Sequence, residues 1–262
     1  MKRMITRCDY IYLVGEFYKL PLIHFFENHG PGDRVKCFYL IDEQNPRPIA
    51  NFDRVRGISF NEEKIGNFAG EVLGCWWRMR GAPKPPRVVF IGGAGVPAVK
   101  RWSSGFENGL AAEFPDHLFI HREISEVEAG FNDYWSAYHL ANFAIEIVKA
   151  DIIVQAAGAS CLGIIDALRG SAADNASNTP CLVCCDYPDW DRFRDSGVEF
   201  LLSATRSIEA AIMSHTTRGV HASNLFSAQN DFRDVSDFGR IYTKNSSAKS
   251  AIKLLIGENY AS

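Results

Sequence analysis

Two stretches of this chain share one order of features: a short apolar strand, a turn that carries glycine, and the start of a helix. They are Arg87–Lys100 (RVVFIGGAGVPAVK) and Asp151–Gly163 (DIIVQAAGASCLG). Such a unit places backbone N–H groups and a helix N-terminus at the carboxyl end of a parallel strand, where open α/β sheets bind small ligands. Two such units predict one α/β lobe with a ligand-facing edge.

Composition and charge exclude several classes of protein. The chain of 262 residues is 47% hydrophobic, which is ample material for a core. It carries 28 Lys and Arg against 31 Asp and Glu, a net charge of −3, with no run of basic residues, so we expect no nucleic-acid partner. The first residues, MKRMITRCDYIYLVGEF, lack the apolar run of a signal peptide, and the sequence as given predicts a cytoplasmic location.

The seven cysteines favour reduced thiols, because their number is odd and no secretory signal accompanies them. Cys181 and Cys184 form a C-x-x-C pair, but the sequence has neither a second pair nor a suitably spaced pair of histidines. We therefore predict no metal site, and we interpret Thr179–Asp186 (TPCLVCCD) as a buried strand in which cysteine acts as a small apolar residue.

Strands and helices alternate along most of the chain, which predicts a doubly wound parallel sheet. Apolar periodicity also predicts a helix over Glu63–Arg80 and one that carries Trp135, Tyr138 and Val148. Gly81–Pro86 (GAPKPP) is the best candidate linker. The expected domains are a partial N-terminal lobe (1–84), a C-terminal ligand-binding lobe (85–202), and a return segment with a diverged tail (203–262).

The turn after the first strand of Arg87–Lys100 satisfies G-x-G-x-x-A from Gly93 to Ala98, a pattern that dinucleotide enzymes use to approach a pyrophosphate. Such enzymes also need an acid about twenty residues further on, and the nearest candidate is Glu123, beyond the next strand. The alternative is a tight turn that packs a helix on a sheet. The sequence contains no HExxH and no G-x-S-x-G elbow, so it predicts no catalytic residues and no enzyme.

Three further residues near predicted strand ends each allow two interpretations. Phe131, just before a helix that Asn132 or Asp133 would cap, either stacks on a planar ligand or packs as a hydrophobic staple. Asp186 either accepts hydrogen bonds from sugar hydroxyls or forms a turn. Arg206 either donates to ligand oxygens or caps a helix elsewhere.

Several segments in fixed order resemble the basic membrane protein family, the PnrA-like solute-binding lipoproteins. They are VVFIGGAGVPAVKRWSSGFENG, the GFND turn, DIIVQAAGASCLGII, CCDYPD and LLSATRS, and the similarity covers roughly Tyr10–Ala210. The resemblance implies a type I periplasmic-binding-protein fold of two doubly wound lobes. It also implies a purine nucleoside held between the lobes without a cofactor, an ABC permease as partner, and an exported, membrane-anchored protein.

The resemblance also implies roles for individual residues. Phe131 resembles the aromatic that stacks on the base, Gly158 the glycine that lets ribose approach, and Asp186 the carboxylate that grips the ribose hydroxyls. Arg206 stands where the family usually has lysine, which keeps the charge but changes the donor geometry. By pattern alone, the N-terminal lobe adds Gly15, Phe17 and Asp42.

The chain departs from the family at both ends. The family's lipoprotein signal, its first βαβ unit and a motif with a second stacking phenylalanine are missing, and the tail after Gly219 does not match. We therefore expect an incomplete N-terminal lobe. Two alternatives remain: a cytoplasmic ligand-sensing regulator with the same fold, and a nucleotide-dependent enzyme that uses the G-x-G-x-x-A turn.

Overall fold

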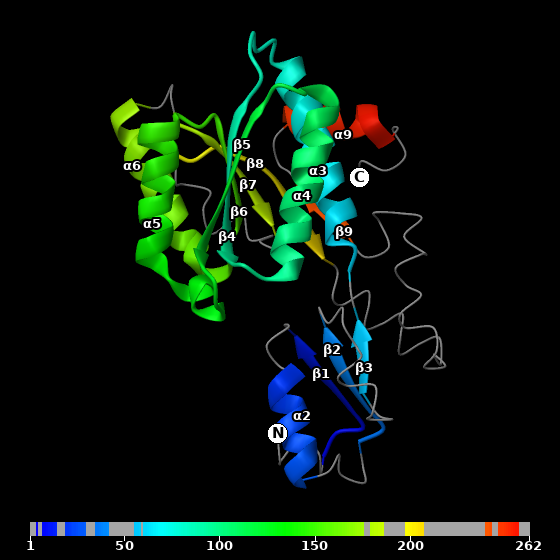
Figure 1. Ribbon diagram of the computed structural model, residues 1–262. Helices are drawn as coiled ribbons and strands as arrows, with labels where there is room; N and C mark the ends of the chain where they lie inside the picture. The colour runs from blue at the N-terminus through cyan, green and yellow to red at the C-terminus, as the bar shows by residue number, and fades with distance from the viewer. Residues whose placement is uncertain are drawn as a thin grey trace. The chain divides into compact units, whose positions relative to one another are not determined.

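The chain divides into two compact units in the computed structural model (Figure 1). One combines Met1–Asn61 with Ser207–Phe238, and the other combines Glu62–Arg206 with Gly239–Ser262. The structure describes residues 4, 7–14, 19–29, 35–41, 55–58, 60–175, 179–185, 197–206, 239–242 and 246–256.

The smaller unit contains a parallel sheet in the order β1-β2-β3, and an α-helix lies between the first two strands in sequence. Its core forms where that helix packs on the sheet: Leu22 and Phe26 meet Phe38 and Leu40, and the Phe26 ring lies edge-on to Phe38 at 4.8 Å. These elements follow the predicted alternation. They are β1 (Tyr10–Val14), α2 (Lys19–His29), β2 (Cys37–Ile41) and β3 (Val55–Ile58).

The larger unit is built on a six-stranded sheet in the order β5-β4-β6-β7-β8-β9. The first five strands are parallel, as predicted, and β9 runs antiparallel to β8, with Ser203 opposite Tyr242 and Arg206 opposite Gly239. The strands are β4 (Arg87–Ala94), β5 (Leu118–Ser125), β6 (Ile152–Ala156), β7 (Cys181–Cys185), β8 (Phe200–Arg206) and β9 (Gly239–Tyr242).

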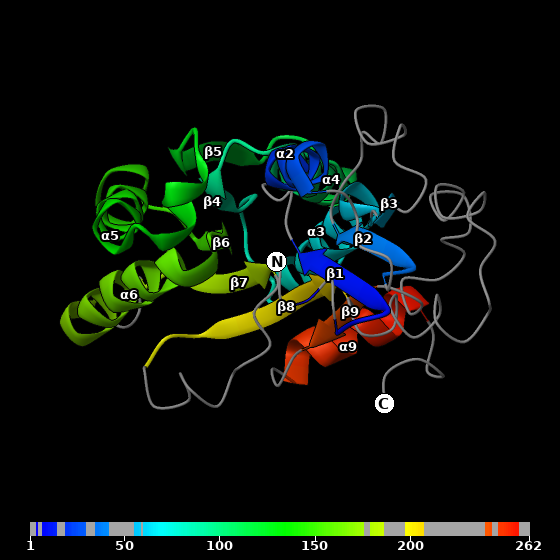
Figure 2. The ribbon, with the colours of Figure 1, turned by 90° about the horizontal axis from the view of Figure 1, so that it is seen from below.

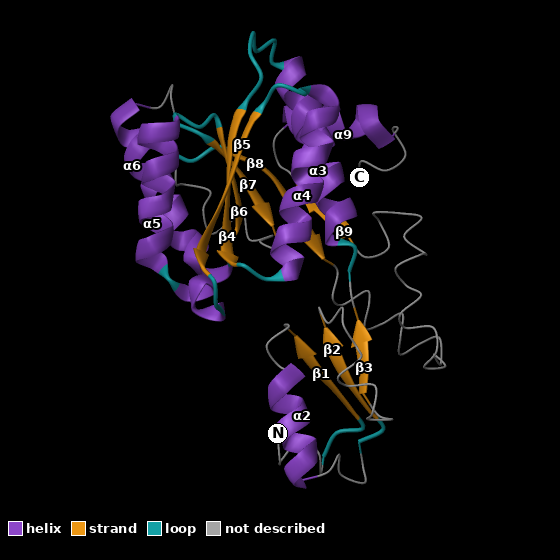
Figure 3. Cartoon of the chain, viewed as in Figure 1, coloured by secondary structure: helices purple, strands orange, loops and turns teal. Residues whose placement is uncertain are grey.

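Helices cover both faces of this sheet, which explains why its central strands are almost entirely apolar. All five residues of β6 and all but the first of β4 are buried. Figures 1 and 3 show one helical layer on each side of the strands, and the turned view in Figure 2 again separates them. One layer holds α5 (Tyr134–Asn142) and α6 (Cys161–Asn175), and the other holds α3 (Glu62–Met79), α4 (Pro97–Glu113) and α9 (Ser246–Ile256).

Glycines bring α3 and α4 into backbone contact. A Cβ at Gly70 would collide with the carbonyl oxygen of Phe106 and lie 2.8 Å from the amide nitrogen of Leu110. A Cβ at Gly105 or Gly109 would in turn meet the backbone of α3. Because real Cβ atoms do not approach this closely, the two helices pack at this separation only while these positions stay glycine.

The division into units differs from the boundary expected at residues 84 and 85. Helix α3 belongs to the larger unit because it packs along α4, so the units part between Asn61 and Glu62. Residues 239–256 also return to the larger unit, where β9 extends the sheet and α9 packs against α3. This placement needs contacts between distant segments, which periodicity does not report.

The predicted helix that carries Trp135 and Val148 is α5 followed by a π-helical turn, η4 (Phe143–Val148), and Trp135 is 66% exposed. Cys181 and Cys184 are buried on β7, which confirms the apolar strand. Among the described residues, no helix combines the length and apolar character needed to cross a lipid bilayer.

Candidate functional site

The carboxyl ends of β4 and β6 meet at one edge of the larger sheet, where Gly92 is opposite Ala156. Two short 3₁₀ turns follow there. After β5, η3 (Glu128–Asn132) packs against the end of β4, and after β6, η5 (Gly158–Ser160) packs against η3. This edge is the candidate functional site, because parallel α/β sheets bind ligands at the carboxyl ends of their strands.

Phe131 is half-buried at this edge, against the backbone of Gly93 near the end of β4. A Cβ at Gly93 would overlap the Phe131 ring, with Cε1 2.6 Å away, and a Cβ at Gly158 would lie 3.3 Å from the Phe131 Cβ. Phe131 also packs against the edge of one hydrophobic core. The structure therefore brings together Phe131 and Gly158, two residues that the sequence singled out in separate motifs.

Gly158 is at a position where the backbone itself requires glycine. Its φ is +56°, in the left-handed region that side chains with a Cβ rarely adopt. The turn before it is held by the buried Gln155, whose Oε1 accepts a hydrogen bond from the Ala157 amide at 3.0 Å. The turn exposes peptide backbone at the sheet edge in a fixed conformation.

Asp133 is the N-cap of α5, which confirms one of the two caps that the sequence allowed. Its carboxylate accepts hydrogen bonds from the Ser136 amide at 3.0 Å and from the Ser136 hydroxyl at 2.7 Å. These bonds stabilise the ionised form and lower the pKa of Asp133 below its ordinary value. The helix therefore starts immediately after the turn that carries Phe131.

Arg206 ends β8 at the same edge of the sheet, and its side chain is half-buried. The strands β6 and β7 separate it from β4 in the sheet order. The other four candidates, Gly15, Phe17, Asp42 and Asp186, lie outside the described residues. In sequence, Gly15, Asp42 and Asp186 each follow the last residue of a described parallel strand.

The glycine turn after β4 does not offer a pyrophosphate site. A Cβ at Gly95 would lie 2.6 Å from a carboxylate oxygen of Glu123 and 3.0 Å from one of Glu126. A dinucleotide would place its phosphates at this helix N-terminus, where two carboxylates would repel them. The structure therefore disfavours the nucleotide-dependent enzyme that the G-x-G-x-x-A pattern allowed.

A serine–histidine–glutamate chain beside this turn was missed by sequence reasoning. Ser103 Oγ lies 2.9 Å from His121 Nδ1, and His121 Nε2 lies 3.5 Å from a Glu123 oxygen. Ser103 is 2% exposed, so its hydroxyl is inaccessible to a substrate. Burial also lowers the pKa of His121. This chain therefore stabilises the packing of α4 on β5 rather than supplying a nucleophile.

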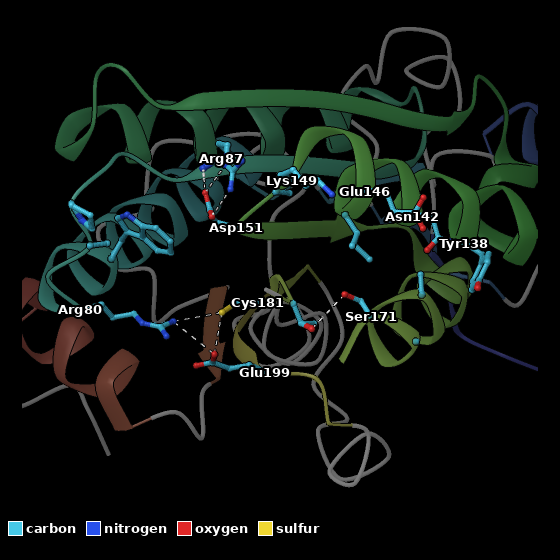
Figure 4. Close-up of a pocket in the computed structure, with 18 residues that line it drawn as sticks. Arg80, Arg87, Tyr138, Asn142, Glu146, Lys149, Asp151, Ser171, Cys181 and Glu199 are labelled. Atoms are coloured by element: carbon cyan, nitrogen blue, oxygen red, sulfur yellow. Dashed lines mark hydrogen bonds and ion pairs between the residues drawn. The ribbon is translucent and has the colours of Figure 1, made fainter. Parts of the chain in front are cut away.

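A groove of about 1180 Å³ lies at the opposite edge, where the strands begin (Figure 4). Four of its charged groups are paired within the unit: Arg87 and Asp151 share two contacts of 3.1 Å, and Arg80 lies 3.8 Å from Glu199. Burial raises the pKa of the Cys181 thiol there to about 12, so it is a poor nucleophile at neutral pH. Within the described part of the chain, no cluster of His, Cys, Asp and Glu could hold a metal ion.

No protein-family model and no curated protein matches the sequence. Solved structures of ABC transporter solute-binding proteins do match the fold. One from Aeropyrum pernix K1 is 14% identical with a TM-score of 0.68, and the match covers 95% of this chain and 63% of that one. This chain therefore spans less than two thirds of that protein.

Two further matches contain bound sugars. A solute-binding protein from Actinobacillus succinogenes 130z with D-allose has 14% identity and a TM-score of 0.60 over 94% of this chain and 81% of that one. One from Burkholderia graminis C4D1M with D-arabinose has 14% identity and a TM-score of 0.58, over 93% and 78%. These similarities show the α/β fold of type I periplasmic binding proteins, as the sequence predicted.

Proposed function

We propose that this chain is a PnrA-like solute-binding protein that presents a purine nucleoside to an ABC permease and catalyses no reaction. The observation that carries the proposal is the position of Phe131, on the backbone of Gly93 and beside Gly158, at the carboxyl edge of a parallel sheet. An aromatic ring there offers a surface for a planar base. The left-handed turn at Gly158 offers close approach to the backbone.

The matched structures that contain D-allose and D-arabinose support a polyhydroxylated ligand. A nucleoside has both parts: its ribose supplies the hydroxyl groups, and its purine supplies the flat apolar face. In the proposal, Asp186 and Arg206 hydrogen-bond to the ribose, and Gly15, Phe17 and Asp42 are further ligand contacts proposed from the sequence pattern alone. The resemblance to an exported family makes an ABC permease the proposed partner.

Calorimetric titration tests this function. The wild-type chain is titrated with inosine, guanosine and adenosine, and separately with D-arabinose and D-allose. We expect saturable binding of at least one nucleoside, weaker binding of the free sugars, and a loss of roughly tenfold or more in affinity for Phe131→Ala, because base–aromatic stacking contributes ~1–3 kcal/mol.

Leu118→Ala is the control, since Leu118 is 44% exposed at the opposite end of β5. This variant should bind as the wild type does. If a folded wild-type chain bound sugars but no nucleoside, a nucleoside ligand would be ruled out and the chain would be a sugar-binding protein. Equal affinities of wild type and Phe131→Ala would reject the stacking role.

A further inference from the structure

Ser160 lies beneath the candidate site and makes contacts on both sides of Phe131. Its Oγ donates a hydrogen bond to the carbonyl oxygen of Gly130 at 2.8 Å. Ser160 Oγ also accepts a hydrogen bond from the amide of Asp133 at 2.6 Å. One hydroxyl group therefore ties together the backbone just before and just after the aromatic residue.

Ser160 is also fixed on its own side. It ends η5, the turn that begins with Gly158, and its amide donates to the carbonyl oxygen of Ala157 at 3.1 Å. Its side chain is 1% exposed, so a ligand at the edge would not touch it. The hydroxyl thus joins the turn that carries Gly158 to the turn that carries Phe131.

We propose that Ser160 is a positioning residue for ligand binding, which holds Phe131 against Gly93 and at a fixed distance from Gly158. This inference rests on the proposed function, because it assumes that Phe131 contacts the ligand. The turn η3 spans only Glu128–Asn132, and within it the Gly130 amide donates to the carbonyl oxygen of Val127 at 3.0 Å. The Ser160 hydroxyl adds hydrogen bonds that join this turn to η5. Without the hydroxyl, the Gly130 carbonyl and the Asp133 amide lose a partner that fixes the turn.

A double-mutant cycle tests the coupling between the two side chains. Affinity is measured for wild type, Ser160→Ala, Phe131→Ala and the double variant, with inosine as the probe, or D-arabinose if the wild-type chain binds that compound instead. We expect Ser160→Ala to weaken binding roughly tenfold in the wild-type background and to have no effect once Phe131 is absent. Thermal stability should fall equally in both backgrounds.

Two companion variants separate positioning from a general loss of structure. Ser160→Cys nearly keeps the side-chain volume but hydrogen-bonds weakly, so it should have a smaller effect in the same direction. Ser171→Ala is the matched control: Ser171 is in α6, the helix that follows Ser160, and is half-buried, with its hydroxyl 3.5 Å from that of Thr179 at the other end of the sheet. It should leave affinity unchanged.

Hydrogen exchange of the ligand-free chain tests the same inference without any ligand. In Ser160→Cys and Ser160→Ala, amides of residues 126–134 should exchange roughly tenfold faster, while those of β4 and β6 keep their protection. If the wild-type chain binds no probe but this local change occurs, the proposed function fails and the positioning role stands. Unchanged exchange in this segment, or an equal affinity loss with and without Phe131, would overturn the inference.

Discussion

At the scale of single residues, Asp133 links the candidate site to the stability of the lobe. Its carboxylate caps α5 through Ser136, and the pKa of Asp133 is lowered because these hydrogen bonds favour the ionised form. A lowered folded-state pKa means that the contribution is complete above the ordinary value of 3.8 and disappears as the pH falls through the folded-state pKa.

We therefore expect Asp133→Ala to lower the melting temperature at neutral pH, and the gap to the wild type to shrink as the pH falls from 3.8 through the lower folded-state pKa of Asp133. Melting curves followed by circular dichroism across this range measure the gap. Asp116→Ala, a change at an exposed aspartate, is the control and should shift the curves little at any pH. A gap for Asp133→Ala that stays constant down to the lowest pH would rule out the ionised cap as its cause.

At the scale of elements, the contact between α3 and α4 gives the sharpest prediction. Gly70 lies against the backbone of Phe106 and Leu110, whereas Gly170, in α6, has no atom within 4 Å of the position its Cβ would take. Gly70→Ala should therefore destabilise the larger unit by ~1–3 kcal/mol through overpacking. Gly170→Ala should stabilise it by up to ~1 kcal/mol, because alanine loses less entropy in a helix.

Urea denaturation of the two variants measures both changes, and their opposite signs identify the cause. Each variant adds one methyl group to a helix, so intrinsic helix propensity predicts stabilisation in both cases. If Gly70→Ala were as stable as Gly170→Ala, then α3 and α4 would not be in backbone contact in solution.

Sequence patterns predicted well the elements whose buried residues follow a regular apolar pattern within one short segment. Near-continuous apolar runs such as RVVFI located β4, and helical spacing of Ile65 and Trp76 located α3. The patterns did not give β9, whose four residues (GRIY) carry no periodic signal and form a strand only by pairing with β8. Nor did they assign α3 to the larger unit, since that depends on the glycines that face α4.

In the candidate site, too, local sequence signals were recognised, whereas contacts between distant segments were not. The position just before a capped helix suggested Phe131, because capping signals are local. The role of Gly158 came from the resemblance to the basic membrane protein family. Ser160 was missed, although it stands two residues after Gly158, because serine in a turn is common and its two partners lie about thirty residues away in sequence. A buried polar residue is recognised by what it contacts, and the contact exists only in the fold.

At the scale of the whole molecule, the described residues of the two units form separate cores of different size. The core of the smaller unit gathers around Leu22, Phe38 and Leu40, whereas the larger unit has an extensive core on each face of its sheet. Because stabilisation grows with buried apolar area, we expect the larger unit to be the more stable of the two.

The tryptophans allow this difference to be measured. All five fall within Glu62–Arg206, the longer segment of the larger unit, so tryptophan fluorescence follows that unit alone. Far-ultraviolet circular dichroism follows the helices and strands of both units. We expect the dichroism signal to begin changing at lower urea than the fluorescence, which is the sign of unfolding in more than one step. Coincident curves from the two probes would mean that the units unfold as a single cooperative structure.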